Sequence, residues 1–236
     1  MRLTRRESVS ILGCALLLAG AAGCASAPEG PPIEAPRLVA GDHWQYRVVD
    51  QLRRGAISRL DVEVISAAAD TARIRVDFDD GATRSEWVDE VDARGGLRAG
   101  ILSHESPRRF DPPAQLLAFP LVQGKTWRQT IETFRRDVEL RDQIQIYGQV
   151  GERRMTTVTA GGYDAVYVYR ILRLDDAEFW RTRTTRRDAI WYAAGVKASV
   201  REAREAEYTE IGGPDVATVR TESTVRELVS FRPGAR

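Results

Sequence analysis

Cysteine, histidine and lysine are scarce in this sequence of 236 residues. The two cysteines, Cys14 and Cys24, both lie near the amino terminus, so the rest of the chain has no pair for a disulfide and must be stabilised by packing. The two histidines, His43 and His104, lie far apart in the sequence. Few of the side chains that commonly build catalytic triads and metal sites are therefore present.

The sequence also lacks an apolar run long enough for a transmembrane helix. The longest, residues 11–22, has about a dozen residues, whereas a helix needs roughly 20 to cross a bilayer. It follows Arg2, Arg5 and Arg6 and precedes a series of small residues, an order typical of a secretion signal. We therefore predict that residues 1–23 are a signal peptide.

The end of this signal resembles a bacterial lipobox, LAGAAGC at residues 18–24, in which the cysteine is acylated and becomes the mature amino terminus. The resemblance implies a lipid anchor at Cys24 that attaches the protein to the membrane. Ala21 stands where the pattern usually has leucine, and ordinary signal cleavage is the alternative. Ala25 is not the aspartate that resembles an inner-membrane retention signal, so we expect the outer membrane, with the protein facing the periplasm. Residues 4–9 also resemble a twin-arginine signal, which leaves the export route open.

Residues 24–37 are predicted to be a proline-rich linker behind the lipidated cysteine. Four prolines and little apolar surface favour an extended segment, which could reach roughly 40 Å at about 3.1 Å per residue. Residues 38–236 are then a single domain. The formal charge is +1 for the whole chain and about −1 without the signal peptide, which argues against nucleic-acid binding.

From residue 38 onward, apolar and polar residues alternate with a period of two. Trp44, Tyr46 and Val48 alternate with polar residues, and the same period recurs in residues 60–64 and 74–78. Such alternation predicts strands that bury one face. We therefore predict an all-β domain built on a curved antiparallel sheet that is open or partly closed into a barrel, like a half-barrel.

Turn signals containing glycine separate the predicted strands. Asp80-Gly81 lies between two alternating segments and predicts a two-residue type I′ hairpin, because both central residues of that turn need positive φ. Residues 148–151 predict a further turn. Residues 103–113 are expected to be a polar connector.

The motif V-x-G-x-x-W occurs twice, starting at Val39 and at Val122. Each copy precedes a predicted strand. The repeat favours two related meanders, residues 39–105 and 119–231, within one sheet, although two strand starts can also resemble each other by chance.

Three motifs in the second half of the chain resemble a pattern in bacterial secreted β-domain families of unknown function. They are FPLVQGKTW at residues 119–127, GGYDA at 161–165 and WYAAGV at 191–196, where Ala194 replaces the proline of that pattern. The resemblance implies an envelope lipoprotein with an elongated, curved antiparallel sheet, similar in outline to the half-barrels of lipoprotein carriers. It implies no chemistry, because these families have no established activity.

The sequence supports no catalytic or metal-binding motif. A G-x-S-x-G nucleophile elbow is absent, so a hydrolase is the weaker alternative. DFDDG at residues 77–81 resembles the start of a calcium loop, but Val88 stands where the closing glutamate belongs. We expect no catalytic residues, no metal and no cofactor.

Arg181 and Arg183 are candidates for binding an anionic group. They lie at alternate positions of one predicted strand, and guanidinium groups bind carboxylates and phosphates bidentately. The alternative is that they pair across strands with acids such as Glu202 or Glu205.

Six aromatic residues could line the concave side of the sheet and hold an acyl chain, although such residues more often form the core. They are Trp44, Tyr46, Trp87, Trp127, Trp191 and Tyr192. We therefore expect a non-enzymatic, lipid-anchored envelope protein that binds an apolar or amphipathic ligand, such as a lipid, or an envelope partner protein. The alternative is a structural or assembly lipoprotein that docks through a sheet edge or an arginine-rich face.

Overall fold

The computed structural model describes residues 30–102, 107–135, 140–174, 181–213 and 216–235. These residues form twelve antiparallel strands and one short 3-10 helix, η1 (Ala194–Val196), which confirms the predicted all-β class. None of the described segments is a helix of the length and hydropathy needed to cross a membrane. The strands are β1 (His43–Asp50), β2 (Ile57–Ala67), β3 (Thr71–Asp79), β4 (Arg84–Asp92), β5 (Leu97–Gly100), β6 (Arg108–Ala114), β7 (Thr126–Arg135), β8 (Leu140–Val158), β9 (Gly161–Leu174), β10 (Arg181–Ala193), β11 (Ala198–Gly213) and β12 (Val216–Arg232).

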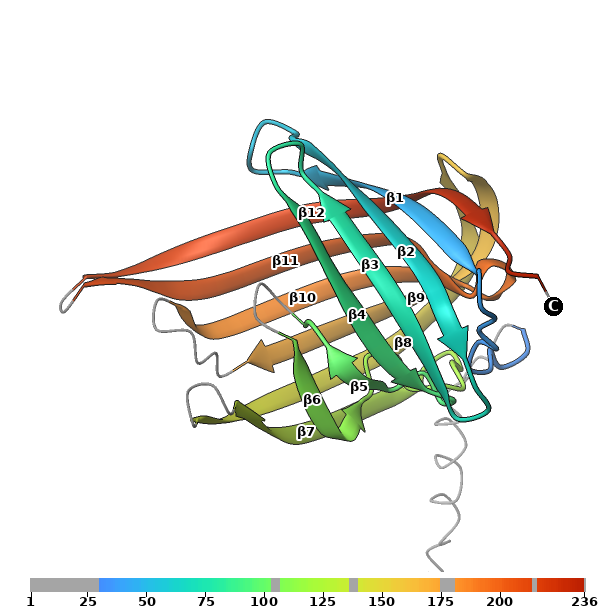
Figure 1. Cartoon of the computed structure of the whole chain (residues 1–236), viewed down its shortest axis with the longest axis horizontal. Helices are drawn as coiled ribbons and strands as arrows, with labels where there is room; N and C mark the ends of the chain where they lie inside the picture. Colours follow the sequence, from blue (N-terminus) through green and yellow to red (C-terminus); the bar gives the residue numbers. More distant parts are fainter. Residues whose placement is uncertain (1–29, 103–106, 136–139, 175–180, 214–215, 236) are drawn as a thin grey trace, which may run out of the picture.

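All twelve strands belong to one sheet. Its order is β6-β5-β4-β3-β2-β1-β12-β11-β10-β9-β8-β7, so strands that follow each other in sequence pair, and the two meanders β1–β6 and β7–β12 join where β1 pairs with β12. The sheet curls until β6 approaches β7, which makes a nearly closed barrel with one seam. In Figure 1 the strands β1–β4 cross in front of the longer strands β8–β12.

Side chains bridge the seam between β6 and β7. The Gln115 N–H donates to Gln129 Oε1 (2.8 Å), and Gln129 Nε2 donates to the Pro113 carbonyl (2.9 Å). Trp127 Nε1 donates to the Gln115 carbonyl (2.9 Å). Because Pro112 and Pro113 have no N–H, β6 cannot form a regular ladder with β7. β6 also corrects the sequence prediction, since it lies within the segment expected to be a polar connector.

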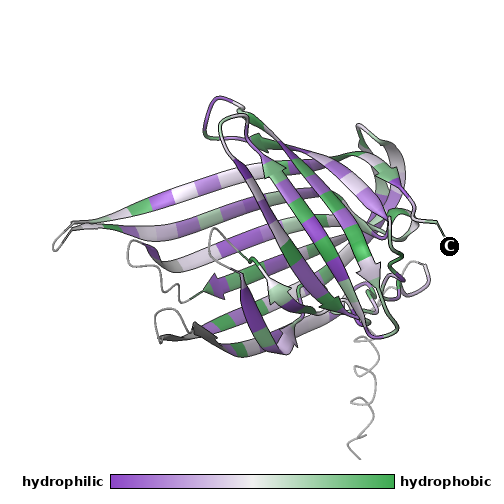
Figure 2. Ribbon diagram, viewed as in Figure 1, coloured by the Kyte–Doolittle hydropathy of each residue, from purple (hydrophilic) through white to green (hydrophobic). Residues whose placement is uncertain are grey.

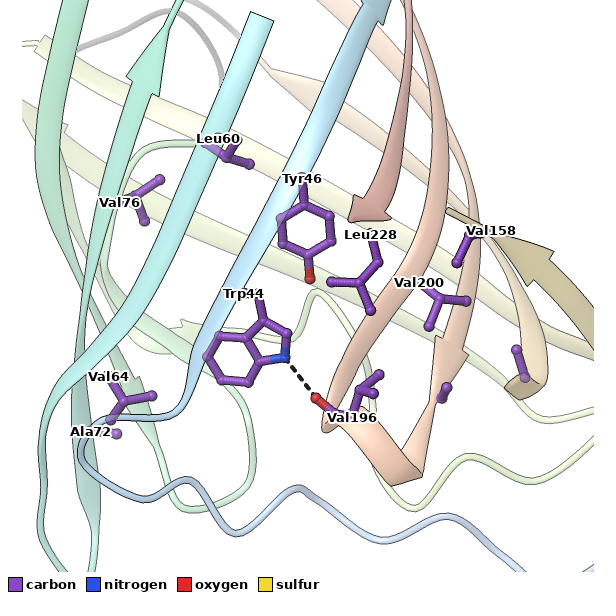
Figure 3. Packing of buried hydrophobic residues seen from close by; sticks show 12 residues of the cluster. Trp44, Tyr46, Leu60, Val64, Ala72, Val76, Val158, Val196, Val200 and Leu228 are labelled. Carbon is purple, nitrogen blue, oxygen red and sulfur yellow. Dashed lines mark hydrogen bonds between the residues drawn. The ribbon is translucent and has the colours of Figure 1, made fainter. Parts of the chain in front are cut away.

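Apolar and polar residues alternate along the strands, as Figure 2 shows, and the apolar side chains form the barrel core. One core cluster surrounds Trp44, Tyr46 and Leu228 (Figure 3). A second contains Ile131, Ile144, Ile146, Leu172 and Leu174, and a third contains Ile33, Leu121, Val150, Val166, Val168, Ile190 and Tyr192.

Residues 148–151 lie inside β8, so the predicted turn there is wrong. The glycines serve packing instead: a Cβ at Gly148 would collide with the ring of Trp127, and a Cβ at Gly151 would lie 2.8 Å from Tyr167 Cδ1. The pairing of β8 with β9 shifts register between Val150 and Arg153. The strand therefore bends at a bulge rather than reversing.

The hairpin between β3 and β4 lies where the sequence predicts it, but its loop is longer than the expected type I′ turn. It spans residues 80–83, and within it Gly81 alone has positive φ (83°). The Asp80 carboxylate accepts hydrogen bonds from the N–H groups of Ala82 (2.9 Å) and Thr83 (2.7 Å). This side chain stabilises the loop in place of a second residue with positive φ.

The carboxyl-terminal part of the predicted linker is attached to the domain. Ile33 exchanges two backbone hydrogen bonds with Leu121 (3.1 and 2.8 Å) and is buried in the core. Ile33 is therefore part of the folded domain, although the sequence places it within the linker.

Candidate functional site

Three of the six candidate aromatic residues belong to the packed interior. Trp44, Tyr46 and Tyr192 are each less than 5% exposed. Trp44 Nε1 donates to the Val196 carbonyl (2.7 Å), as Figure 3 shows, and its ring stacks on Phe231 at 5.4 Å between centroids. These rings fill space between strands and present little surface to a ligand.

The other three aromatic residues lie in different places. Trp87 is half-buried against the cluster around Trp44, and Trp127 bridges the seam. Trp191 points to the opposite face of β10 from Ile190, where it packs on Tyr167 (5.4 Å between centroids). The structure therefore does not gather the six aromatic residues on one surface.

Of the candidate anion-binding pair, Arg181 lies on the concave side of the sheet. Its guanidinium lies 3.8 Å from the ring centroid of Tyr208, and it bonds Thr184 Oγ1 (3.0 Å) and Glu222 Oε1 (3.2 Å). The cross-strand partners considered from the sequence, Glu202 and Glu205, are not the ones that it contacts here. The side chain of Arg183 lies outside the described residues, as do Cys24 and His104.

The concave side of β9–β12 carries a network of buried charges that we call the arginine network. Arg170 binds the Asp188 carboxylate through Nε (2.9 Å) and Nη2 (2.6 Å), and Arg186 binds it through Nε (3.0 Å). Glu202 accepts from Arg204 Nη2 (3.0 Å) and Arg226 Nη2 (2.5 Å). The network comprises Arg170, Arg186, Asp188, Glu202, Arg204 and Arg226.

These residues lie on one face because the strands are in register. Arg170 is opposite Asp188, and Glu202 is opposite both Ile190 and Arg226. Side chains alternate between the two faces of a strand, so the residues that lie on the same face as the buried Ile190 all point into the barrel. The charges therefore share the interior with the apolar core.

Two arginines of the network reach across the barrel to the other layer. Arg186 Nη1 donates to the Leu102 carbonyl, and Arg170 Nη1 donates to the Leu116 carbonyl (2.9 Å). Leu102 follows β5, and Leu116 follows β6. The network thus connects β9 and β10 to the segments that flank β6 at the seam.

The electrostatics keep the network ionised. Burial alone would raise the pKa of the Asp188 carboxyl, but the guanidinium groups of Arg186 and Arg170 outweigh this effect and hold the pKa below its ordinary value. The pKa of Glu202 is lowered in the same way, by Arg226 and Arg204 against the effect of burial. Burial lowers the pKa of Arg186 to about 10, so it stays charged at neutral pH.

Asp89 is a half-buried carboxyl of a different kind. It lies on β4, accepts a long hydrogen bond from the Ile101 N–H (3.4 Å) and packs against Gly100, where a Cβ would collide with its carboxylate. Burial raises the pKa of Asp89 to about 6. Its charged form is therefore destabilised by burial, and the carboxyl titrates closer to neutral pH than an ordinary aspartate does.

Towards one end of β11 and β12, the charged concave face becomes accessible to water. The side chain of Arg204 is 38% exposed and that of Arg226 is 25% exposed, although both point to the concave side. Arg220 follows in the same phase of β12, 55% exposed and ion-paired with Glu210. We call this surface the concave shelf. It comprises Arg181, Arg204, Glu210, Arg220, Glu222 and Arg226, of which Arg181 is buried (3% exposed) and the other three arginines are open to water.

The chemistry of the concave shelf is that of ion pairing. Arginine presents fixed, planar donors that match carboxylate and phosphate groups. Among the described residues, no three His, Cys, Asp or Glu side chains come together in a way that could hold a metal ion. The arginine network was not predicted from the sequence, although a signal was present. Thr184, Arg186 and Asp188 lie at every second position of β10, on the same face as the buried Ile190 and Tyr192.

No protein-family model matches this sequence, and a search of curated proteins finds no match. Similar solved structures include a candidate lipoprotein from Parabacteroides distasonis (TM-score 0.48, 12% identity, 86% of this chain and 100% of that chain covered). Others are a candidate exported protein with a YmcC-like fold from Bacteroides fragilis (0.44, 10%, 86% and 100%) and the hypothetical lipoprotein YmcC from Escherichia coli (0.42, 8%, 83% and 86%). These values are too low to transfer a function or a localisation to this chain.

Proposed function

We propose that this chain is a lipid-anchored protein of the bacterial cell envelope, attached to the membrane through Cys24, and that it works by binding rather than by catalysis. The lipobox-like segment at residues 18–24 supports the anchor. We infer the periplasmic side of the outer membrane because Ala25 is not the aspartate that resembles an inner-membrane retention signal.

The binding surface that we propose is the concave shelf, and its partner is an acidic surface of another envelope protein. The observation that carries this proposal is that arginines on the concave face remain open to water. The shelf has four arginines and two glutamates, so it favours acidic groups. Its mixed charges, spread over three strands, fit an extended protein surface better than one small anion.

The geometry supports docking more than the carriage of an acyl chain. Trp44, Tyr46 and Tyr192, three of the six candidates for lining such a chain, are packed against other core residues. A ligand would have to displace them at a cost of several kcal/mol each.

Two measurements test the proposal. Cys24→Ser should move the chain from the membrane fraction to the soluble fraction and remove the diacylglyceryl mass from its first peptide. A photo-crosslinking residue at Thr218, which is exposed on the concave side, should give an adduct with a second protein in intact envelopes.

Arg220→Glu should abolish that adduct, whereas Arg59→Glu should leave it. Arg59 is the matched control, since it is 64% exposed and ion-paired with Asp61 but lies on the opposite face of the sheet. An adduct that survives Arg220→Glu would contradict docking through the shelf. Salt-sensitive binding of the chain to phosphatidylglycerol vesicles, lost in Arg220→Glu, would replace the protein partner with a lipid head group.

A further inference from the structure

β12 continues well past the end of β1 and so has a free edge. β1 pairs with β12 from Thr224 to Arg232, and the last contact is the Gln51 N–H donating to the Ser223 carbonyl (2.8 Å). Residues 216–222 pair with β11 on one side. Among the described residues, no backbone group pairs with Ala217, Val219 or Thr221 from the other side. Figure 1 shows this part of the β11–β12 hairpin projecting from the barrel.

The register tells which backbone groups are free. In an antiparallel pair, residues alternate between those that exchange hydrogen bonds with one neighbour and those that turn to the other. Because Ser223 bonds towards β1, the residues two, four and six positions before it turn their N–H and C=O groups to the same side. These residues are Thr221, Val219 and Ala217.

This edge lacks several of the features that usually protect one. It has no proline, no lysine and no bulge between Ala217 and Glu222, in contrast to β6 with its two prolines. The charge of Arg220 is turned to the concave side and paired with Glu210. On the opposite face Val219 is 65% exposed, and Ile211 of β11 is exposed on the same side.

We propose that two copies of this chain pair through this edge, antiparallel and centred on Val219. Val219 is the middle residue of the free segment, so a two-fold axis there pairs the whole segment with itself. Val219 then faces Val219 of the second copy, and Ala217 faces Thr221. All the free N–H and C=O groups of these residues are satisfied. Arg220 lies opposite Thr218, so no like charges oppose each other.

The pairing is expected to be weak in solution, because seven residues of strand bury less area than a standard interface of about 1,600 Å². Anchoring in one bilayer raises the effective concentration of the two copies. This gain in strength rests on the proposed lipid anchor, whereas the pairing itself does not.

Val219→Cys in the full chain, in isolated membranes under mild oxidation, tests the proposal. Hydrogen-bonded pairs of antiparallel strands have Cα atoms about 5.5 Å apart, within the range for a disulfide. A disulfide-linked dimer is therefore expected. Ile211→Cys is the matched control: it is exposed on the same face but one strand further from the axis. It lies roughly 20 Å from its counterpart, three strand spacings of about 4.8 Å across the sheet and four residues of about 3.4 Å along it. It should give no dimer.

Adding Thr221→Pro to Val219→Cys should abolish the crosslink and leave thermal unfolding nearly unchanged, since the lost N–H faces the free edge. Equal dimer from Ile211→Cys, or undiminished dimer with Thr221→Pro, would mean random collision and overturn the proposal. A monomeric Val219→Cys, or its crosslink to a different protein, would also overturn it. Fractionation of the same samples reports the anchor separately.

Discussion

Asp188 carries a buried negative charge that several arginines of the network contact. It has no exposed surface, and its carboxylate lies within 3.5 Å of guanidinium nitrogens from Arg170, Arg186 and Arg204. A buried ion pair contributes little net stability over an apolar pair, but removal of one partner leaves charges uncompensated. The carboxylate is therefore more costly to lose than its hydrogen bonds alone indicate.

We expect Asp188→Asn to lower the free energy of unfolding by about 3–5 kcal/mol, because several buried guanidinium groups lose their counter-charge. Urea denaturation at pH 7 measures the change. Asp164→Asn is the control, since its pair with Arg153 is half-exposed and should contribute about 0–1 kcal/mol. Equal effects of the two substitutions would contradict this account of the network.

Asp89 should show the opposite dependence on pH. Its folded-state pKa of about 6 lies above the unfolded value of about 3.9, so its contribution to stability is full below pH 4 and is lost as pH rises through 6. Asp89→Asn should therefore stabilise the protein at pH 8 by about 2–3 kcal/mol and have little effect at pH 4. Thermal or urea unfolding at both pH values measures the difference.

Asp188→Asn provides the contrast for this experiment. The pKa of Asp188 is lowered on folding, so its contribution is full above the unfolded value and shrinks as pH falls. Its destabilisation should be larger at pH 8 than at low pH. A stabilisation by Asp89→Asn that does not change with pH would show that burial does not disfavour its charge.

The residues of the site could be predicted only in part. Arg181 was a candidate from the sequence and lies on the concave shelf, but Arg186 and Asp188 were not considered. Charged residues in an alternating strand are ordinarily on the solvent side, and a single sequence does not show that a second layer covers them. The pairing of Arg170 with Asp188, 18 residues away, depends on the β9–β10 register.

At the scale of elements, the seam determines how the barrel closes. Gln129 provides both a donor and an acceptor to the segment that ends β6, in place of a backbone ladder. Side-chain hydrogen bonds are individually weak, so this boundary should open more readily than the laddered strands.

We expect Gln129→Ala to destabilise the protein by about 1–2 kcal/mol, because the half-buried N–H of Gln115 and carbonyl of Pro113 lose their partners. Hydrogen exchange should become faster in β6 and stay unchanged in β9 and β10. Thr130→Ala is the control, as it changes the neighbouring, exposed residue of β7. Loss of protection spread evenly over all strands would show that the seam is not a separate unit.

The strands were largely predictable from the period of two in their sequences, whereas the turn predicted at residues 148–151 was wrong. Alternation identified β1, β2 and β3, since each buries one face. Gly148 and Gly151 were misread because glycine marks both turns and close approaches of a large ring to a strand. The distinction depends on Trp127 and Tyr167, which come from neighbouring strands.

At the scale of the whole molecule, the attachment of Ile33 would set how far the barrel can move from the proposed lipid anchor at Cys24. About nine residues separate Cys24 from Ile33, which would allow about 28 Å at 3.1 Å per residue. The full linker predicted from the sequence would allow roughly 40 Å. With the proposed anchor, the attachment of Ile33 would therefore keep the barrel closer to the lipid.

Ile33→Asp should release this attachment, because a carboxylate is disfavoured in the apolar site between Leu121 and the core. Energy transfer from a dye on Glu152→Cys, an exposed position, to a lipid-bound acceptor should decrease, and protease cleavage within residues 30–37 should increase. Ile57→Asp, at an isoleucine that is 60% exposed, should change neither. Unchanged transfer in Ile33→Asp would contradict the role of the attachment.

The pairing of strands that follow each other in sequence was within reach of the sequence, but the junction of β1 with β12 was not. Each meander pairs neighbours along the chain, which local turn signals predict. The pairing of β1 with β12 joins residues about 180 positions apart, and no local pattern encodes it.

That junction has a consequence for how the protein is made. The last strand to leave the ribosome is the one that lies between β1 and β11, so until it emerges both neighbours present unsatisfied backbone along their lengths. A nascent chain that stops short of residue 216 would contain strands β1–β6 and β7–β11 without β12, the strand that joins the two groups. The barrel can therefore close only when the whole chain, including β12, is available to fold, before or after export.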